Sequence, residues 1–591
     1  MYNFNFSEKI QTAWKFISSF LVLVNPLNKS FFILTICFFL TSCKEKLEDK
    51  IAKGGKKYGG EISFVETETV RSFFPLTSSG LHDQRLLSNL FEPLLKVDYK
   101  TQKIIPNLAK NFSVSNDGKT IDLIIRKDVY FHTDNYNDFE LEKMSVEDVK
   151  FSLEFACSGN KLNQLGHVLT KKIVGSTSFQ NRSKNSFPSR GVSGIKIKND
   201  STITIQLTNS FNNFTSLLSH PSIVVFSKKA YLHYKQKSSI HPVGTGPFQL
   251  QSIDKNEIIL VRNSNYWKFD DFGNQLPFLG KIRILKPTIS KNEQLLFSKG
   301  KTDILLQLPV DRLEFAFGTL KEAKDGRNLL HRILYRKGIK VNYLAFNCTS
   351  KPFNDERVRL AFYHAIDREN LWLNVLNGDG NIASKGFVPI SDFYSDEKVC
   401  ALKFDPQKAQ KLLASAGYSN SNLFPKIYLF LPTKKGSLIS LYYQELVRQI
   451  KANLGIEMHI KHTDFASRNK LIEQNKIKIW KAGWVSDYPD PESYLGVFYS
   501  GYKGLNNYTW NLYGFKNKKF DSLFYQSIIV KDLKTKMNLQ NQCDQILVNK
   551  AAVVPLYTED IFIIVNIRAR DIEVNSSGII DFSKTYIKAP K

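Results

Sequence analysis

The chain lacks several features that would indicate an enzyme. It contains no G-x-x-x-x-G-K-[ST], no H-E-x-x-H and no G-x-S-x-G motif, which argues against P-loop nucleotide binding, HExxH metalloproteases and nucleophile-elbow hydrolases. It has six cysteines in 591 residues and no C-x-x-C pair, so zinc ribbons and thioredoxin-type redox sites are not expected. We therefore expect no catalytic residue, no metal and no cofactor. Either three alternative disulfide pairings or free buried thiols are compatible with the four widely spaced cysteines, Cys157, Cys348, Cys400 and Cys543.

Composition and charge place the chain among globular multidomain proteins. Hydrophobic residues make up 42% of it, with 31 glycines and 20 prolines, which excludes disordered, collagen-like and linker-dominated chains. The formal net charge of +27 favours anionic partners. The lysines are dispersed, however, and no basic motif with interleaved aromatic residues accompanies them, so no nucleic acid is expected as a partner.

An apolar segment near the start predicts export from the cytoplasm. Residues 31–40 have the length of a signal-peptide core and are too short to span a bilayer. They lead into Leu40-Thr41-Ser42-Cys43, which resembles a bacterial lipobox with Cys43 as the lipidated residue. We expect a signal peptide over 1–43, a polar tether over 44–60, and a lipoprotein anchored at the periplasmic face of the cell envelope. A buried or membrane helix over the apolar segment is the alternative.

Alternating strand and helix patterns predict mixed α/β domains. Apolar residues follow helical spacing after Asp355, and Asp367 and Asp405 stand where they can cap the next two helices. We expect further helices at 438–453 and 466–474, and strands at 121–126, 202–207, 456–462 and 477–484. Residues 158–192 are rich in lysine and serine and are expected to form a long surface excursion. The last strand leads into the loop 485–491, where open α/β sheets place ligands.

Five groups of segments resemble the extracytoplasmic solute-binding proteins of peptide-type ABC transporters, the oligopeptide- and dipeptide-binding family 5. In chain order they are 105–109 with 114–120, 125–132 with 145–149, 242–248 followed by Asn265-Tyr266-Trp267, 357–368, and the Gly-Trp-Val-Ser-Asp-Tyr-Pro-Asp-Pro run at 483–491. Each match alone is weak. Their occurrence in family order, from about residue 60 to the C-terminus, indicates the family.

The resemblance implies an α/β, two-lobed periplasmic-binding-protein-like fold of type II, in its large three-domain peptide-binding form, with a hinge and a ligand cleft between the lobes. The first lobe is expected to be discontinuous, built from 61–91, 199–289 and 541–591. A subdomain is inserted into it at 92–198, and the second lobe covers 290–540. Closure of the two lobes around a ligand is a known switching mode of such folds.

The same resemblance implies a ligand site in the loop that follows the last strand. In peptide-binding relatives the aspartate at the position of Asp487 pairs with the α-ammonium of the peptide, and backbone groups at the Gly483 and Val485 positions bond its main chain. Trp484 and Tyr488 are expected to line side-chain pockets. The alternatives are a turn-capping role for Asp487 and core packing for Trp484.

The implied partners are a short peptide, an ABC permease with its ATPase subunits, and the membrane through the N-terminal lipid; the protein is expected to be a monomer and not an enzyme. Three alternatives stay open: another solute, such as a nickel complex or an oligosaccharide; a surface receptor or adhesin; and a hydrolase that uses Asp487, Asp490 and Glu492. No short motif identifies the partner of the ligand's carboxylate.

Overall fold

The computed structural model describes residues 50–588, apart from 67–69, 71, 78–79, 134–139, 287–292, 307–330, 396, 420–422, 434 and 502–510. The predicted signal peptide and its Cys43 lie outside the described residues. Within the described ranges, no helix is both long enough and apolar enough to cross a membrane. The four cysteines of the folded part are free thiols in this structure.

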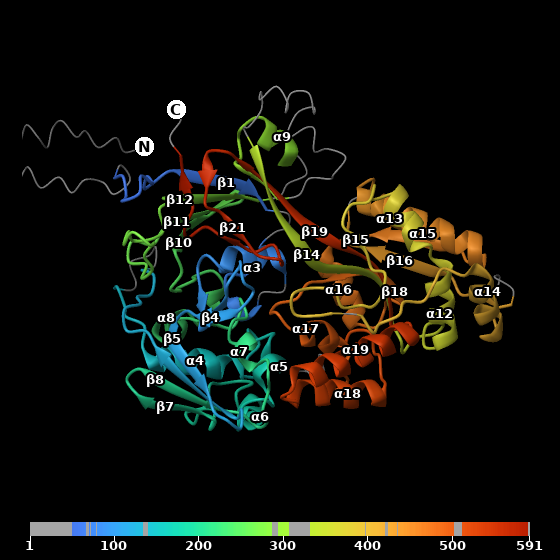
Figure 1. Cartoon of the computed structure of the whole chain (residues 1–591), viewed down its shortest axis with the longest axis horizontal. Helices are drawn as coiled ribbons and strands as arrows, with labels where there is room; N and C mark the ends of the chain where they lie inside the picture. Colours follow the sequence, from blue (N-terminus) through green and yellow to red (C-terminus); the bar gives the residue numbers. More distant parts are fainter. Residues whose placement is uncertain are drawn as a thin grey trace, which may run out of the picture.

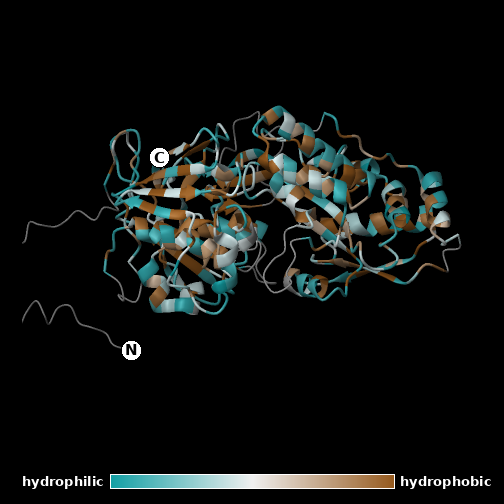
Figure 2. Ribbon diagram, turned by 90° about the horizontal axis from the view of Figure 1, so that it is seen from below, coloured by the Kyte–Doolittle hydropathy of each residue, from teal (hydrophilic) through white to brown (hydrophobic). Residues whose placement is uncertain are grey.

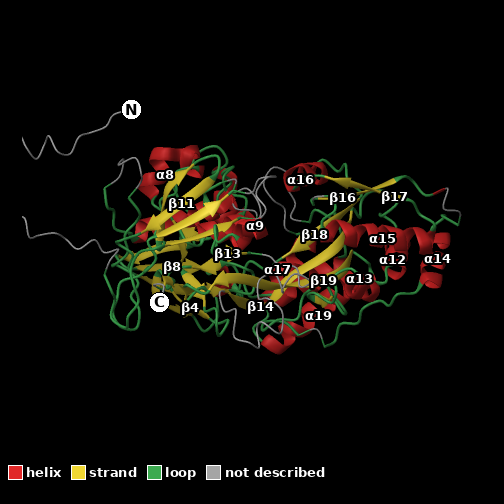
Figure 3. Cartoon of the chain, turned by 90° about the horizontal axis from the view of Figure 1, so that it is seen from above, coloured by secondary structure: helices red, strands yellow, loops and turns green. Residues whose placement is uncertain are grey.

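Two long antiparallel strands connect two lobes (Figures 1 and 3). These strands are β14 (His331–Phe346) and β19 (Val553–Asn566). They lie in a sheet of order β10-β11-β12-β1-β13-β19-β14-β18-β16-β17, with β15 paired to β19. Their register shifts between Arg336 and Lys340, and a Cβ on Gly338 within this shift would lie 1.6 Å from the carbonyl oxygen of Glu559. Only glycine allows so close an approach of two strands at this crossing.

The first lobe combines one end of this sheet with a smaller antiparallel sheet of order β5-β6-β8-β7. Buried and partly exposed positions alternate along β6, as expected when one face of a strand packs on a core. Helix α4 begins with a capping box between Ser145 and Asp148. The elements of this lobe are β1 (Glu61–Val65), α3 (Leu81–Leu87), β2 (Glu92–Pro93), β3 (Leu95–Val97), β4 (Ile104–Pro106), β5 (Ala109–Val114), β6 (Thr120–Ile125), α4 (Val146–Ala156), α5 (Gly166–Leu169), α6 (Ser176–Arg182), β7 (Ile195–Asn199), β8 (Thr202–Gln206), α7 (Phe214–Leu217), β9 (Val224–Val225), α8 (Lys228–Tyr234), β10 (Phe248–Ile253), β11 (Glu257–Arg262), β12 (Lys281–Leu285), α9 (Glu293–Ser298), β13 (Ile304–Leu305), β20 (Ala569–Arg570), β21 (Glu573–Val574), β22 (Ile580–Asp581) and β23 (Tyr586–Ile587).

The second lobe packs helices against the other end of the central sheet. Its two predicted caps are confirmed, because the side chains of Asp367 and Asp405 each accept a hydrogen bond from the first turn of the following helix. The structure adds a third cap, in which the Asp355 side chain accepts from the backbone N–H of Arg357. The elements of this lobe are α12 (Glu356–Ala365), α13 (Arg368–Asn374), β15 (Asn381–Ile382), α14 (Pro406–Ser415), β16 (Ile427–Leu431), α15 (Leu438–Leu454), β17 (Met458–His462), α16 (Phe465–Glu473), β18 (Ile479–Trp484), α17 (Glu492–Leu495), α18 (Lys518–Ile529) and α19 (Leu533–Asn549).

Apolar residues gather between the sheets and helices of both lobes, while hydrophilic residues cover the outer helix faces (Figure 2). One core cluster runs through the first lobe and continues past the crossing strands to Trp480 and Phe498. A second cluster lies under α12, α14 and α15 and includes Phe362 and Leu446. The long helix α15 thus buries a stripe of apolar residues, as its 3.6-residue periodicity predicts.

Three expectations need correction. Residues 158–192 are not a surface excursion: this stretch contains α5 and α6, and Leu169, Phe179 and Lys172 are buried. The predicted tether is shorter than 44–60, because Ala52 and Tyr58 are already packed in a small core cluster. The predicted lobe boundary between 540 and 541 falls inside α19, a continuous helix that ends at residue 549.

Candidate ligand-binding site

The predicted site loop begins where β18 ends, next to the contact between the lobes. Strand β18 pairs antiparallel with β14, which places Gly483 opposite Asn342 and Trp484 opposite Val341. On its other edge β18 pairs with β16 only at Ile479 and Trp480. Among the described strands, none pairs with residues 481–484 on that edge. An edge of this kind can accept an added strand through main-chain hydrogen bonds.

The loop brings Asp487 into contact with two side chains of the other lobe. Gln84 of α3 donates a hydrogen bond from Nε2 to Oδ1 of Asp487 at 2.9 Å. His220, which follows α7, places Nε2 3.8 Å from Oδ2 of Asp487. The Nδ1 atom of His220 accepts a hydrogen bond from the backbone N–H of Ser222, so the neutral ring carries its proton on the Nε2 atom that faces Asp487. In the second lobe, the backbone N–H of Asp487 donates to Oγ of Ser493.

These neighbours keep Asp487 ionised. Burial raises the pKa of this carboxyl, but the nearby His220 and the hydrogen bond from Gln84 outweigh burial and lower the pKa below its usual value of 3.8. A carboxylate has about four lone-pair sites for hydrogen bonds. Gln84 uses one of them, and His220 is beyond direct hydrogen-bond distance. The charged group therefore keeps acceptor capacity for a cationic partner.

Trp484 and Tyr488 stand beside Asp487 in a small cavity of about 40 Å³ that both lobes line. The indole Nε1 of Trp484 donates to the carbonyl oxygen of Ser493 at 2.8 Å, which fixes the ring against α17. The ring centroid of Tyr488 lies 6.2 Å from that of His220. The structure thus brings together Trp484, Asp487 and Tyr488 at one cavity, while Gly483 lies in the strand that leads to it.

The two acids that follow Asp487, Asp490 in the loop and Glu492 at the start of α17, have lysine partners inside the protein. The carboxylate of Asp490 pairs with the ammonium of Lys536, and that of Glu492 with the ammonium of Lys172 at 3.0 Å. A general acid/base pair needs carboxyl groups that face a common reacting atom. Here each of the two carboxylates is held by its own lysine, so the arrangement gives no support to a hydrolase. Among the described residues, no group of three or more His, Cys, Asp or Glu side chains could hold a metal ion.

Comparisons with known proteins identify the family of the chain. Residues 103–506 match the family described as bacterial extracellular solute-binding proteins, family 5, middle region. The chain belongs to this family. It is 25% identical over 482 residues to heme-binding protein A of Haemophilus influenzae, covering 79% of this chain and 81% of that protein. It is 24% identical over 503 residues to the peptide transport periplasmic protein SapA of Salmonella typhimurium, covering 82% of this chain and 84% of that protein.

Solved structures show the same fold. The periplasmic binding protein DppA from Helicobacter pylori, in complex with the peptide STSA, superposes with a TM-score of 0.76 at 22% identity, covering 90% of this chain and 99% of that one. The two-lobed periplasmic-binding-protein fold expected from the sequence is therefore confirmed, and the family is one of solute-binding proteins.

Sequence reasoning missed the first-lobe half of the site. Gln84 and His220 lie 403 and 267 residues before Asp487 in the chain, and neither belongs to a motif that the resemblance used. Lys172 was missed for another reason, since a lysine in a lysine-rich segment is usually solvated. Only the fold brings these residues to the loop.

Proposed function

We propose that this family member is the substrate-binding component of an ABC importer, which captures short peptides between its lobes and delivers them to a membrane permease and its ATPase subunits. Family membership supports an extracellular solute-binding role. Two similar proteins support a peptide as the ligand: SapA, which is named for peptide transport, and DppA, whose solved structure contains a bound peptide. The observation that carries the proposal is an ionised Asp487 with open acceptor sites at the contact between the lobes.

In this proposal Asp487 binds the α-ammonium of the peptide. The open edge of residues 481–484 supports a strand-like peptide pose, in which backbone groups of Gly483 and Val485 bond the main chain of the ligand. Such bonds are independent of side-chain identity, so the ammonium contact fixes the register. Trp484 and Tyr488 then offer apolar surface to the side chains of the peptide.

Closure of the two lobes follows from the contacts of Asp487 with both of them. Asp487 belongs to the second lobe, while Gln84 and His220 belong to the first. A ligand bound to Asp487 therefore contacts both lobes and stabilises their closed arrangement, which the permease recognises.

The proposal includes the location and organisation of the chain. Residues 1–43 act as a signal peptide, and Cys43 carries a lipid that anchors a monomeric protein at the periplasmic face of the envelope. The first lobe consists of 61–91, 199–305 and the residues after α19, with the subdomain 92–198 inserted, and the second lobe runs from β14 to the end of α19.

Calorimetry on the purified full chain tests the ligand class. The dipeptide Ala-Ala, the tripeptide Ala-Ala-Ala and their N-acetylated forms are titrated in parallel. We expect binding of free peptides and a loss of about 2–5 kcal/mol on acetylation, because the partly buried carboxylate loses its cationic partner. Equal affinity for acetylated peptides would contradict the role of Asp487. Complete absence of peptide binding, together with binding of a nickel complex or an oligosaccharide, would identify another solute, and no binding at all would favour a receptor or adhesin.

A further inference from the structure

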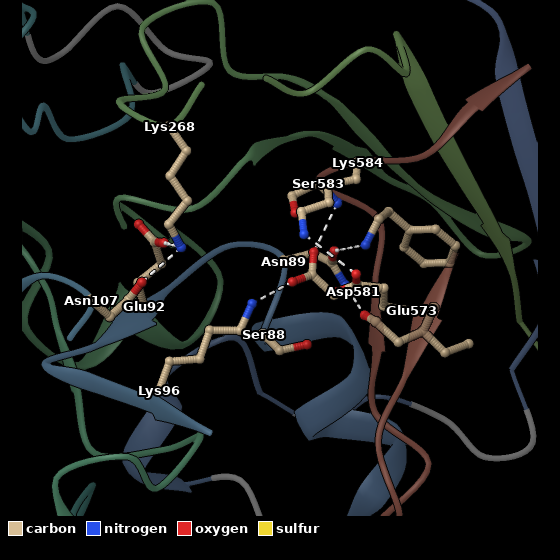
Figure 4. Close-up of polar contacts among 12 residues, drawn as sticks. Ser88, Asn89, Glu92, Lys96, Asn107, Lys268, Glu573, Asp581, Ser583 and Lys584 are labelled. Atoms are coloured by element: carbon tan, nitrogen blue, oxygen red, sulfur yellow. Dashed lines mark hydrogen bonds and ion pairs between the residues drawn. The ribbon is translucent and has the colours of Figure 1, made fainter. Parts of the chain in front are cut away.

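A second cavity, of about 90 Å³, lies on the first-lobe side of Asp487. Ser219 and Pro221, the two neighbours of His220 in the chain, line this cavity together with Asp487. The first cavity is lined by His220 and Asp487 as well, so the contact between these two residues lies between the two cavities. The second cavity extends from there to a cluster of charged side chains around Lys96 and Lys268 (Figure 4).

The acceptors of Glu92 in this cluster are already used. Its carboxylate accepts hydrogen bonds from Tyr266 and Lys268 at Oε1, and from Trp267 and Thr245 at Oε2. These four bonds match the acceptor capacity of a carboxylate. Glu92 is 4% exposed, so it is a structural anchor and has little capacity left for a ligand.

The two lysines of the cluster have more N–H donors than their hydrogen bonds to the described residues use. The ammonium of Lys96 donates to Oδ2 of Asp581 at 2.6 Å, and its side chain is 27% exposed. The ammonium of Lys268 donates to Glu92 and to Oδ1 of Asn107 at 2.7 Å. Each ammonium has three N–H donors. Among the described residues, one donor of Lys96 and two donors of Lys268 therefore have a hydrogen-bond acceptor. The two ammonium groups also lie 5.1 Å from the ring centroid of Tyr99 and 4.7 Å from that of Trp267, and both lysines line the cavity.

We propose that this cavity receives the side chain of the first residue of the ligand and selects a carboxylate there, bound by Lys96 and Lys268. The inference rests on the proposed function, in which the α-ammonium of the peptide lies on Asp487. The side chain of that first residue branches from the carbon atom that carries the ammonium, so it can enter the cavity that Asp487 lines. Asp581 and Glu92, which line the cavity besides Asp487, are each paired with one of these two lysines.

The test compares peptides that differ only in their first side chain. The full chain is titrated with Glu-Ala, Gln-Ala, Leu-Ala and Lys-Ala, and with the tripeptides that carry one more alanine. We expect Glu-first peptides to bind at least about tenfold more tightly than Leu-first peptides, a difference of about 1.4 kcal/mol. Gln-first peptides should fall between them, and Lys-first peptides should bind most weakly.

Two variants separate recognition from folding. Lys96→Gln keeps a neutral donor toward Asp581, and it should reduce the preference for Glu over Leu to within about twofold, because the affinity for Glu-Ala falls more than the affinity for Leu-Ala. Lys127→Gln makes the same change at an exposed lysine paired with Asp200 and should change nothing.

Equal affinity of the wild-type chain for all four first residues, or a preference for Leu or Lys, overturns the inference and leaves peptide binding intact. Binding of none of these peptides overturns the proposed function, and this inference with it. The wild-type series decides between these outcomes even if Lys96→Gln does not fold.

Discussion

Asp487 lies in the loop 485–491 and Glu492 begins α17 directly after that loop, and the two acids differ in what surrounds their charge. The Glu492 side chain is 2% exposed and pairs with the equally buried ammonium of Lys172 from the first lobe, and it also accepts a hydrogen bond from Asn213 of that lobe. The Asp487 side chain is 20% exposed, and the first-lobe side chains that it meets through polar contacts, among the residues that the structure describes, are those of His220 and the neutral Gln84. A carboxylate whose cation is built into the protein serves to join the lobes. A carboxylate that lacks a built-in strong cation is available to the cation of a ligand.

Replacing Lys172 by Met should give the largest effect, because closure would then bury the charge of Glu492 without the lysine. Removing one partner of a buried pair costs about 3–5 kcal/mol. The cost falls on the closed arrangement, so we expect a larger radius of gyration in small-angle scattering and a weaker affinity for every ligand, acetylated or not.

The double variant Lys172→Met with Glu492→Leu should recover most of the closure, since an apolar pair can replace a buried ion pair at little cost. Lys171→Met provides a matched control: this neighbouring lysine is exposed and donates to the carbonyl oxygen of Gly501. A single variant Lys172→Met that scatters and binds like the wild type would show that the Glu492 pair does not hold the lobes.

Asp487→Asn should weaken binding of free peptides by about 2–5 kcal/mol, which is roughly 30-fold to several-thousand-fold. The amide still accepts a hydrogen bond from Gln84, and no buried lysine loses its partner, so the melting temperature should change little. Calorimetry with Ala-Ala-Ala and its acetylated form measures the effect. The comparison with Glu492 would be wrong if the two ligands lost affinity equally, because Asp487 would then act on closure and not on the ligand's charge.

The sequence predicted much of the second-lobe side of the site and little of the first-lobe side. Short-range signals predicted the caps at Asp367 and Asp405, and both are present because a cap depends on residues within one turn. The family motif placed Asp487 after a strand, where the structure has the end of β18.

What the sequence could not indicate are contacts that join distant segments. Lys172 and Glu492 are 320 residues apart, and the polar composition of residues 158–192 favoured a surface position for the whole stretch. The structure buries Lys172 because the inserted subdomain packs against the loop of the other lobe. Neither periodicity nor local composition reports such packing.

The pH dependence of binding should show whether the charge of Asp487 holds the ligand. A carboxyl whose pKa in the folded protein lies below its usual value of 3.8, as that of Asp487 does, keeps its charge at higher pH and loses it as pH falls through the lowered value. The ratio of affinities for free and acetylated peptides should therefore stay constant from neutral pH to about pH 4 and decline below that. In Asp487→Asn the ratio should be flat throughout, and a decline that starts near pH 6 in the wild type would point to a different titrating group.

The exposed contacts between the lobes should give the smallest effect. Lys531 of the second lobe donates to the carbonyl oxygen of Asn116, and Asn209 of the first lobe donates to the hydroxyl of Tyr525, both at the surface. Water replaces such bonds when the lobes open, so Lys531→Ala and Asn209→Ala should each change closure by no more than about 0.5 kcal/mol, or roughly twofold in ligand affinity. Scattering and calorimetry measured beside Lys172→Met check this. If either surface variant opened the lobes as far as Lys172→Met does, closure would depend on the whole interface, and the buried pair at Glu492 would be one contact among many.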